Sequence, residues 1–464
     1  MTRLLDVDHL VVGAGAAGMA FTDALVDHSD ARVAMVDRRD GVGGHWRHAY
    51  PFVQLHQSST FYGVASTLLG GGRIQTEGPE AGLHERADQP TILAYYEDVL
   101  ARRMVGPGRV ELFTGCDYLG DRTFVSRETG ERFAVPERCT VVDARYVSPD
   151  IPAETPPRFT VDGARVVPVN ALPDTGPASQ HVVVGSGKTA TDSIVWLLRR
   201  GVDPDRIRWV RPREPWMLDR ATIQPDPVVY LGMVADLMQV AAGAPDLPTL
   251  FAGLEEAGIM MRIDPGLTPS MAKAPTLGRW ELELLRSVED VVRLGRVRVA
   301  RRDRLELEDG TVAIDHDALV VNCAADGLKQ PPRVPVWQRD GADGEASLIT
   351  LQPVRAGFPC FGAALIGYVE ATRDDDAEKN RLCPPSVFGN ALTDWARMNV
   401  LGFRASAAFG AEPDVKAWSD RVALNPARVA PEHPRTPELA AVQARLAATV
   451  PPGLARLEEL SRPA

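Results

Sequence analysis

Two short glycine-rich segments carry the clearest signs of chemistry in this sequence. Residues 13–18 read G-A-G-A-A-G and residues 185–190 read G-S-G-K-T-A, and each follows an apolar run and precedes a stretch of helical character. In such a loop the first glycine permits a tight turn, and the second lets the backbone approach a pyrophosphate. The third position, where alanine is accepted, lets helix and strand pack closely. The spacing therefore predicts two dinucleotide-binding loops, each ending at a helix N-terminus that can bind phosphate.

The residue at the end of the next expected strand differs between the two loops. Asp37 stands 24 residues after Gly13, where a carboxylate can accept hydrogen bonds from a ribose diol. Arg211 stands 26 residues after Gly185, and Arg213 follows it closely. An acid repels a 2′-phosphate, whereas a guanidinium binds one through charge-assisted bonds. We therefore expect a cofactor with a free ribose diol at the first loop and NADPH at the second, with Arg211 contributing more than Arg213.

Each loop is embedded in a strand-helix-strand pattern. The expected elements are 9–13, 16–26 and 32–37 around the first loop, and 180–185, 189–200 and 207–211 around the second. A Pro-rich connection over 149–177 separates the two patterns, and a buried strand over 318–323 closes the second. We expect an α/β fold with two Rossmann-like dinucleotide-binding domains, the second nested in the first.

Composition excludes several classes of partner. The chain has 464 residues with 51 Lys+Arg against 62 Asp+Glu, a formal net charge of −11 that cannot neutralise nucleic-acid phosphates or anionic lipid. We expect no nucleic-acid and no membrane partner. The longest apolar stretch, 228–244, is interrupted by Asp236 and is too short for a membrane span, and we expect no cleavable leader at the N-terminus.

The cysteines and histidines do not form a recognisable metal site. Five cysteines are scattered without a C-x-x-C pair, which argues against a zinc site and a disulfide framework and favours the reducing cytoplasm. His45, His48 and His56 lie near the first loop, where we expect them to support a cofactor-binding loop by hydrogen bonds rather than to bind metal. We expect no metal.

In these residues the chain resembles the flavoprotein monooxygenases with two dinucleotide-binding domains, which include flavin-containing, N-hydroxylating and Baeyer–Villiger monooxygenases. The resemblance covers most of residues 8–325. Residues 43–46 read G-G-H-W, similar to the G-G-x-W segment along FAD in that group, and residues 50–59 resemble its flavin-side loop. Residues 320–327 stand where the group carries an A-T-G turn.

The resemblance implies an FAD-dependent, NADPH-using monooxygenase that oxygenates a small-molecule substrate with O2 through a C4a-(hydro)peroxyflavin. Residues 161–167 lack the F-x-G-x-x-x-H pattern of the Baeyer–Villiger and flavin-containing members, which favours N-hydroxylation. The alternative is an FAD/NAD(P)-binding flavoprotein that acts as an oxidase or without turnover. The sequence leaves open whether the chain forms a homo-oligomer, and it names no catalytic side chain.

The patterns described above, together with the resemblance, give the expected domain limits and binding residues. We expect 1–168 to be the first part of the FAD-binding domain, 169–325 to be the NADPH-binding domain with a helical insertion at about 214–296, and 326–464 to return to the first domain and end in helices. The expected cofactor-binding residues are Gly13, Gly15, Ala16, Gly18, Asp37, Arg38, Gly44, His45, Trp46, Gln57, Gly185, Ser186, Gly187, Lys188, Thr189, Arg211 and Arg213.

Two features allow two interpretations each. Residues 351–355 and 361–368 are either a returning flavin segment or a turn followed by a core helix. Six large side chains of the expected insertion either line a substrate pocket or belong to the core or to a subunit contact, and we favour the core; these are Trp216, Met217, Tyr230, Met233, Met271 and Trp280.

Overall fold

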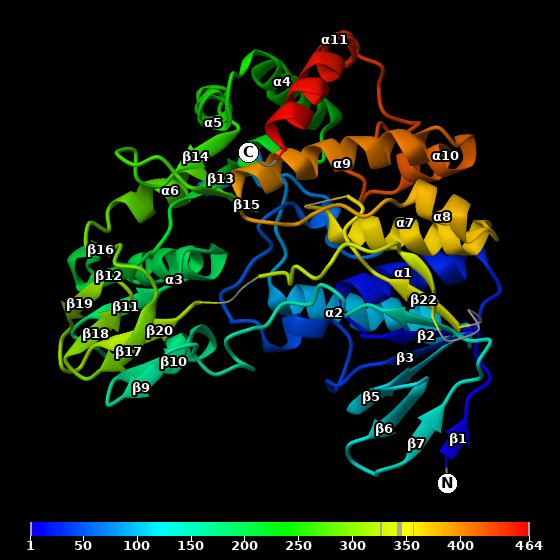
Figure 1. The fold of residues 1–464 in the computed structure, drawn as a ribbon, viewed down its shortest axis with the longest axis horizontal. Helices are drawn as coiled ribbons and strands as arrows, with labels where there is room; N and C mark the ends of the chain where they lie inside the picture. Colours follow the sequence, from blue (N-terminus) through cyan, green and yellow to red (C-terminus); the bar gives the residue numbers. More distant parts are fainter. Residues whose placement is uncertain (1, 325–326, 341–345, 356, 463–464) are drawn as a thin grey trace.

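The chain folds into two α/β units and a layer of helices, as the computed structural model in Figure 1 shows. The structure describes residues 2–324, 327–340, 346–355 and 357–462. Ala325 and Asp326, which belong to the segment resembling the A-T-G turn and to the expected end of the second domain, lie outside the described residues.

The first unit is built on a six-stranded sheet in the order β21-β22-β8-β2-β3-β4. Its strands are β2 (His9–Val12), β3 (Val33–Val36), β4 (Val110–Phe113), β8 (Thr140–Asp143), β21 (Trp337–Asp340) and β22 (Ala346–Thr350). Neighbouring strands are parallel except for β21 and β22, which are antiparallel. Because β22 follows the second unit in sequence yet pairs with β8, the second unit is nested in the first, as the sequence predicts.

Helices cover one face of this sheet and a small sheet covers the other. The helices are α1 (Ala16–His28), α2 (Gln89–Val99) and α7 (Pro359–Thr372), which share a hydrophobic cluster with Val11 and Met35 of the sheet. A Cβ at Gly367 of α7 would lie 2.3 Å from the Phe21 carbonyl oxygen of α1, so the glycine permits the close contact of these two helices. The other face packs against β1 (Thr2–Leu4), β5 (Cys116–Gly120), β6 (Thr123–Ser126) and β7 (Arg132–Ala134).

The second unit repeats this plan with a five-stranded parallel sheet in the order β10-β20-β11-β12-β16. Its strands are β10 (Arg165–Pro168), β11 (His181–Val184), β12 (Ile207–Val210), β16 (Val291–Val292) and β20 (Leu319–Asn322). Helix α3 (Lys188–Arg199) covers one face. A small sheet covers the other, with strands β9 (Thr160–Asp162), β17 (Val297–Arg301), β18 (Arg304–Leu307) and β19 (Gly310–Ala313).

The second unit begins earlier than residue 169, the limit that we expected. Strands β9 and β10 precede that residue, yet β9 pairs with β17 and β10 pairs with β20. Both lie inside the Pro-rich connection, whose composition hides them. Because β10 is an edge strand, it tolerates Pro168 at its end, where a central strand would lose a ladder hydrogen bond.

The segment 214–296 contains strands as well as the expected helices. Its three-stranded sheet consists of β14 (Met260–Arg262), β13 (Pro215–Asp219) and β15 (Met271–Leu277), in that order. Its helices are α4 (Pro227–Gly243), α5 (Leu247–Glu256) and α6 (Arg279–Arg286). The apolar residues of β13 and β15 pack against helices, so their hydrophobic pattern resembles that of buried helix segments.

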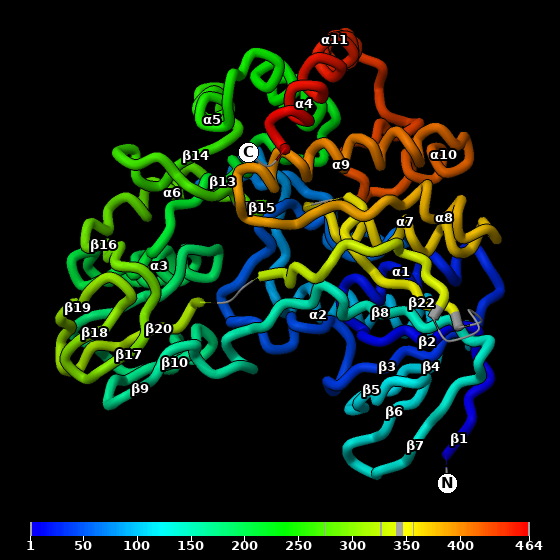
Figure 2. The backbone as a smooth tube through the Cα atoms, viewed as in Figure 1, coloured from blue at the N-terminus to red at the C-terminus, as the bar shows by residue number. Residues whose placement is uncertain are grey.

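The C-terminal helices are α8 (Asp376–Leu382), α9 (Leu392–Gly410), α10 (Pro413–Arg421) and α11 (Pro437–Leu460). Of these, α9 contacts β15 and α11 contacts α4, whereas α8 and α10 contact α9. Figure 2 shows α11 beside α4, and a Cβ at Gly453 of α11 would lie 2.4 Å from the Met238 carbonyl oxygen of α4. Short helical turns link the elements, among them η1 (Gly44–His48), η2 (Ser59–Phe61), η3 (Leu100–Val105), η4 (Val169–Asp174), η5 (Pro204–Arg206) and η6 (Arg220–Thr222). In the described part of the chain, we find no helix with the length and apolar character of a membrane span.

Candidate active site

The first glycine loop has the geometry of a phosphate-binding turn. Gly13 has a φ of +112°, which an L side chain rarely adopts, and a Cβ at Gly18 would lie 2.0 Å from the Gly13 carbonyl oxygen. Gly15 is the N-cap of α1 and brings no capping side chain, and Ala16 begins the helix. The N–H groups of the first turn of α1 therefore have no side-chain acceptor from their own cap.

Asp37 is buried and binds this loop. Its Oδ2 accepts a hydrogen bond of 2.7 Å from the Ala14 backbone N–H, and its Oδ1 accepts one of 2.8 Å from the Arg39 backbone N–H. Each carboxylate oxygen keeps a second lone pair that a ribose hydroxyl could use. The 43–44 segment closes over the loop, since the Gly43 N–H donates to the Ala14 carbonyl oxygen at 2.9 Å.

The remaining residues expected near the first loop have partners of their own. The Trp46 Nε1–H donates to the Tyr62 hydroxyl at 2.6 Å. Burial and the nearby Arg39 lower the pKa of His45 to about 4, so the imidazole is neutral at pH 7. Arg38 forms an ion pair with Glu154, although the arginine side chain is 56% exposed. Arg38 thus lies near the loop but is held by a carboxylate.

The second glycine loop repeats the first with one change. Gly185 has a φ of +147°, and a Cβ there would lie 3.0 Å from the Cys323 carbonyl oxygen. Gly187 is the N-cap of α3 and, like Gly15, contributes no capping side chain. Ala190 stands in place of the third glycine and is fully buried. Ser186 lies in the loop before the cap, while Lys188 and Thr189 open the helix.

A buried acid in α3 connects the two units. The Tyr50 hydroxyl of the first unit donates to Asp192 Oδ2 at 2.7 Å. Lys188, one turn earlier in α3, forms an ion pair with the same carboxylate, and both charged side chains are nearly buried. Burial and the charge of Asp192 raise the pKa of Tyr50 well above its usual value, so the phenol is the donor. The segment that follows Trp46 is therefore fixed against the helix that begins at the second loop.

Arg211 is not placed as the sequence analysis predicts. It is 2% exposed, its Nε donates to Glu214 Oε1 at 3.0 Å, and its Cζ lies 4.2 Å from the centroid of the Trp209 ring. Burial lowers its pKa. Its Nη1 is buried without a hydrogen-bond partner in the described part of the chain. Because the side chain turns inward to an acid three residues later, Arg211 supports the strand end rather than facing solvent.

Arg213 is the exposed arginine of this strand end. No ion pair joins it to an acid in the residues that the structure describes. Glu214 also accepts a hydrogen bond of 2.7 Å from Arg293 Nε, so its charge is shared by two other arginines. Of the two arginines that we expected to bind a 2′-phosphate, Arg213 has the free guanidinium.

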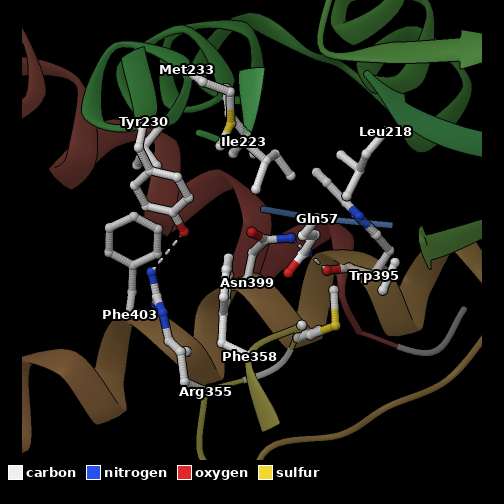
Figure 3. A pocket seen from close by; sticks show the side chains of 16 residues that line it. Gln57, Leu218, Ile223, Tyr230, Met233, Arg355, Phe358, Trp395, Asn399 and Phe403 are labelled. Atoms are coloured by element: carbon white, nitrogen blue, oxygen red, sulfur yellow. Dashed lines mark hydrogen bonds between the residues drawn. The ribbon is translucent and has the colours of Figure 1, made fainter. Parts of the chain in front are cut away.

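Residues of the first unit and of the helical layer line a cavity (Figure 3). The empty space there is about 700 Å³, with the open solvent at its mouth included. Its walls come from the segment after Trp46, from β13 to α4, from the residues before α7, and from α9. The lining residues are Gln57, Leu218, Ile223, Tyr230, Met233, Val234, Leu237, Ala274, Arg355, Gly357, Phe358, Trp395, Met398, Asn399, Gly402 and Phe403.

A buried charge network supports the loop that carries Gln57. Arg220 is 1% exposed, pairs with Glu80 and with Glu281 at 2.7 Å, and donates from Nε to the His56 carbonyl oxygen at 2.9 Å. Arg86 pairs with Glu80 at 2.9 Å and donates to the Leu55 carbonyl oxygen at 3.0 Å. Through these bonds the two arginines fix the backbone of residues 55 and 56, which directly precede Gln57.

His56 lies beside this network and is neutral. Burial, followed by the charges of Lys188, Arg220 and Arg86, lowers its pKa to about 3. Its Nδ1 is buried and has no hydrogen-bond partner among the residues that the structure describes. In that same part of the chain, no group of three His, Cys, Asp or Glu residues could hold a metal ion.

The two open interpretations have mixed outcomes. Trp216, Met217 and Tyr230 belong to hydrophobic clusters, Met233 and Trp280 pack against them, and Met271 is buried. Tyr230 and Met233 also line the cavity. Residues 361–368 lie in the buried helix α7, and the residues before that helix line the cavity.

The five cysteines are free and buried, and burial raises the pKa of Cys323 and that of Cys360 to about 12.

Sequence reasoning missed three polar or charged elements of this site. Arg355, Asn399 and the Arg220 network lie far from both glycine loops in sequence. An arginine inside the conspicuous segment 351–355 is a signal that could have identified the first of them. No short motif marks the other two.

Comparison with known proteins gives one family-model match and several relatives. Residues 11–63 match a model described as an NAD(P)-binding Rossmann-like domain. The uncharacterized protein Rv2000 of Mycobacterium tuberculosis (strain ATCC 25618 / H37Rv) is 39% identical over 427 residues, which are 91% of this chain and 78% of that protein. The uncharacterized protein Mb2023 of Mycobacterium bovis (strain ATCC BAA-935 / AF2122/97) gives the same figures.

Solved structures give more distant likenesses. An open crystal structure of cyclohexanone monooxygenase has a TM-score of 0.49 at 16% identity and covers 79% of this chain and 88% of that chain. A flavin-containing monooxygenase from Stenotrophomonas maltophilia has a TM-score of 0.44 at 15% identity, covering 80% of this chain and 98% of that chain. Both scores are too low to bear on the activity. The identity to the mycobacterial proteins extends over most of both chains, and the protein therefore belongs to their family, with a Rossmann-like domain at residues 11–63.

Proposed function

We propose that this protein is an FAD-dependent, NADPH-using monooxygenase that oxygenates a small molecule with O2 in the cytoplasm. The hydrogen bond between Tyr50 and Asp192 carries the proposal. It fixes the segment between Trp46 and Gln57 of the first unit against α3, which begins at the second glycine loop. Hydride transfer between two bound dinucleotides requires their reactive rings to meet, and a fixed contact between the two units supports such an arrangement.

The first loop fits FAD. Gly13 and Gly18 give the close backbone turn that a pyrophosphate needs, α1 offers N–H groups at its start, and Asp37 has lone pairs left for a ribose diol. Gly44 approaches the loop so closely that a Cβ on it would lie 2.8 Å from the Gly15 Cα. This pair of glycines permits the close backbone contact that holds the 43–44 segment against the loop.

The second loop fits NADPH, with Arg213 as the residue that would bind the 2′-phosphate. Arg211 would contribute indirectly, by holding the strand end through Glu214 and Trp209. Lys188 would lie beside the phosphates of NADPH, and in this structure its charge is balanced by an ion pair with Asp192.

The side chains at the cavity would bind and orient a substrate and exclude water. Bound FAD supplies hydride acceptance and oxygen activation, which no side chain can supply. Gln57 offers an amide at the end of the cavity nearest the first unit, and the apolar walls keep bulk water from the reacting atoms. We assign no general base. We propose a nitrogen atom as the target, on the sequence ground that the F-x-G-x-x-x-H pattern is missing at 161–167.

The test begins with the purified protein. We expect one FAD per chain by absorbance and by chromatography of the released cofactor, and NADPH-dependent oxygen consumption at an electrode. With a panel of amines, the product should contain one atom of oxygen from ¹⁸O2. Failure to bind FAD after reconstitution would refute the proposal. Stoichiometric hydrogen peroxide with every substrate would instead assign the protein as an oxidase.

A further inference from the structure

One charged side chain lies in an otherwise neutral cavity. Of the 16 described residues that line it, Arg355 alone has a charged side chain. In the described part of the chain, no Asp or Glu lies within ion-pair distance of this guanidinium. A cation in an apolar wall is costly unless something compensates its charge. The site therefore has the capacity to bind an anion.

Neutral groups from two helices orient this arginine. Its Nη2 donates to the Tyr230 hydroxyl of α4, and its Nη1 donates to the Ser406 hydroxyl of α9, both at 3.3 Å. Figure 3 shows the Tyr230 hydroxyl and the Arg355 guanidinium pointing toward each other. Hydrogen bonds of this length are weak, and a guanidinium has five N–H donors. Most of its donor capacity remains unused.

A glycine makes room for the guanidinium. A Cβ at Gly402 of α9 would lie 3.2 Å from Arg355 Nη1, so a larger residue there would press on the charged group. The arginine therefore points into the helical layer, which lies outside the duplicated glycine-loop units. Its ligand is accordingly expected to be the molecule that fills the cavity and not a dinucleotide.

The rest of the cavity determines the kind of molecule. Aromatic and aliphatic side chains such as Phe358, Phe403 and Met233 form most of its surface. Gln57 and Asn399 each add an amide. The Asn399 amide N–H donates to the Trp395 carbonyl oxygen at 2.9 Å, whereas the Gln57 amide makes no hydrogen bond to another side chain in the described residues. Such walls fit a hydrocarbon or aromatic body with one charged end and few further polar atoms.

We propose that the substrate of this site is a small carboxylate with an apolar body, whose carboxylate binds Arg355. The role of substrate rests on the proposed function, whereas the binding does not. A guanidinium matches a carboxylate in planar, bidentate geometry. A single cation balances a monoanion, whereas a phosphate dianion would need a second positive group, which the lining residues do not provide.

Equilibrium dialysis of the purified holoprotein at pH 7 tests the proposal without turnover. The probes are two matched pairs, octanoate with octanamide and 4-phenylbutanoate with 4-phenylbutanamide, which differ in charge and hardly in size. We expect the wild-type protein to bind a carboxylate at least about tenfold more tightly than its amide. Arg355→Met should remove this preference and leave the affinity for the amide nearly unchanged.

Two further variants keep the result interpretable. Arg355→Lys retains the charge but loses the planar fork, so the carboxylate preference should fall without vanishing. Arg397→Met removes the same charge from an exposed position of α9 that does not line the cavity, and it should leave the preference unchanged. Equal binding of acid and amide by the wild-type protein would overturn the proposal even if Arg355→Met failed to fold.

Other outcomes are equally decisive. Failure of both carboxylates to bind would overturn the proposal, as would a preference that survives in Arg355→Met. Flavin content and NADPH-dependent oxygen consumption are measured on the same wild-type preparation. If these are absent while the carboxylates bind through Arg355, the proposed function fails and the anion site stands.

Discussion

The preference for NADPH over NADH gives the sharpest test of the proposed coenzyme site. The sequence favoured Arg211 as the main ligand of the 2′-phosphate, whereas the structure favours Arg213. Arg213 is exposed and without an acidic partner in the described residues, whereas Arg211 is buried against Glu214 and Trp209. The change to make is Arg213→Ala. It removes the free guanidinium and leaves the backbone and the buried pair in place.

The magnitude follows from the exposure of the side chain. A hydrogen bond to a charged group contributes about 1.5–3 kcal/mol, and solvent screening places an exposed contact at the lower end. Since about 1.4 kcal/mol corresponds to tenfold in binding, Arg213→Ala should raise the KM for NADPH roughly tenfold. The KM for NADH, which has no 2′-phosphate, should stay within about twofold of the wild-type value. Steady-state NADPH and NADH oxidation at saturating O2 measures both.

Two other arginine-to-alanine variants, each of which also removes one positive charge, serve as controls for Arg213→Ala. Arg211→Ala leaves the buried Glu214 with Arg293 alone, so it should lower the free energy of unfolding by on the order of 3 kcal/mol and affect both coenzymes alike. Arg302→Ala, at an exposed position of the second unit, should change neither KM. A selective loss of NADPH affinity in Arg211→Ala but not in Arg213→Ala would refute the assignment, and a wild-type preference for NADH would refute the NADPH site itself.

Three other predictions concern the first unit and its supporting network. Gly15→Val should release FAD, because the two methyl groups beyond a Cβ that lies 3.4 Å from the Gly44 Cα would occupy space that a pyrophosphate needs, and absorbance after desalting would show the loss. Gly176→Val, at a glycine whose Cβ would have no atom within 4 Å, should keep the flavin. His56→Gln should weaken the loss of stability in acid. The pKa of His56 is about 3 in the folded protein and about 6.5 in the unfolded chain, so the unfolded chain takes up the proton first as the pH falls. The free energy of unfolding should therefore fall by about 2 kcal/mol between pH 6.5 and pH 5. Urea unfolding at both pH values measures this, and the exposed His316→Gln should retain the wild-type dependence. Arg220→Met should lower the free energy of unfolding by roughly 3–5 kcal/mol, because the buried Glu281 loses its ion-pair partner and the buried Glu80 keeps only Arg86; an unchanged melting temperature would contradict it.

Local constraints explain why the glycine loops could be predicted from the sequence. The third glycine is needed because a Cβ at Gly18 would lie 2.0 Å from the Gly13 carbonyl oxygen, a contact between residues only five apart. At the second loop the third position is Ala190, which carries a Cβ, and a Cβ at Gly185 would lie 3.0 Å from the carbonyl oxygen of the distant Cys323. There the spacing of the motif, rather than this close contact, is the local signal. Strand, turn and helix therefore follow from a short window, and the nesting of the second unit follows from the order of the two windows.

Side-chain direction could not be predicted in the same way. The position of Arg211 at a strand end was visible, but its orientation is decided by packing on Trp209 and by Glu214. An acid three residues after the arginine was the available signal, since it offers a closer partner than any ligand. Strands β9 and β10 were missed for a related reason, because their pairing partners lie more than 130 residues away in sequence.

The cavity divides the chain into parts with different tasks. The two glycine loops belong to units with the same plan, and that plan explains dinucleotide binding in both. The cavity is lined by Gln57 of the first unit, but most of its walls come from 218–274 and 355–403, which have no counterpart in the duplicated pattern. Substitutions in those two segments should therefore change which molecule is bound while leaving coenzyme choice to the loops. Arg355 belongs to this unduplicated part, which is why its charge is better explained by a substrate than by either cofactor.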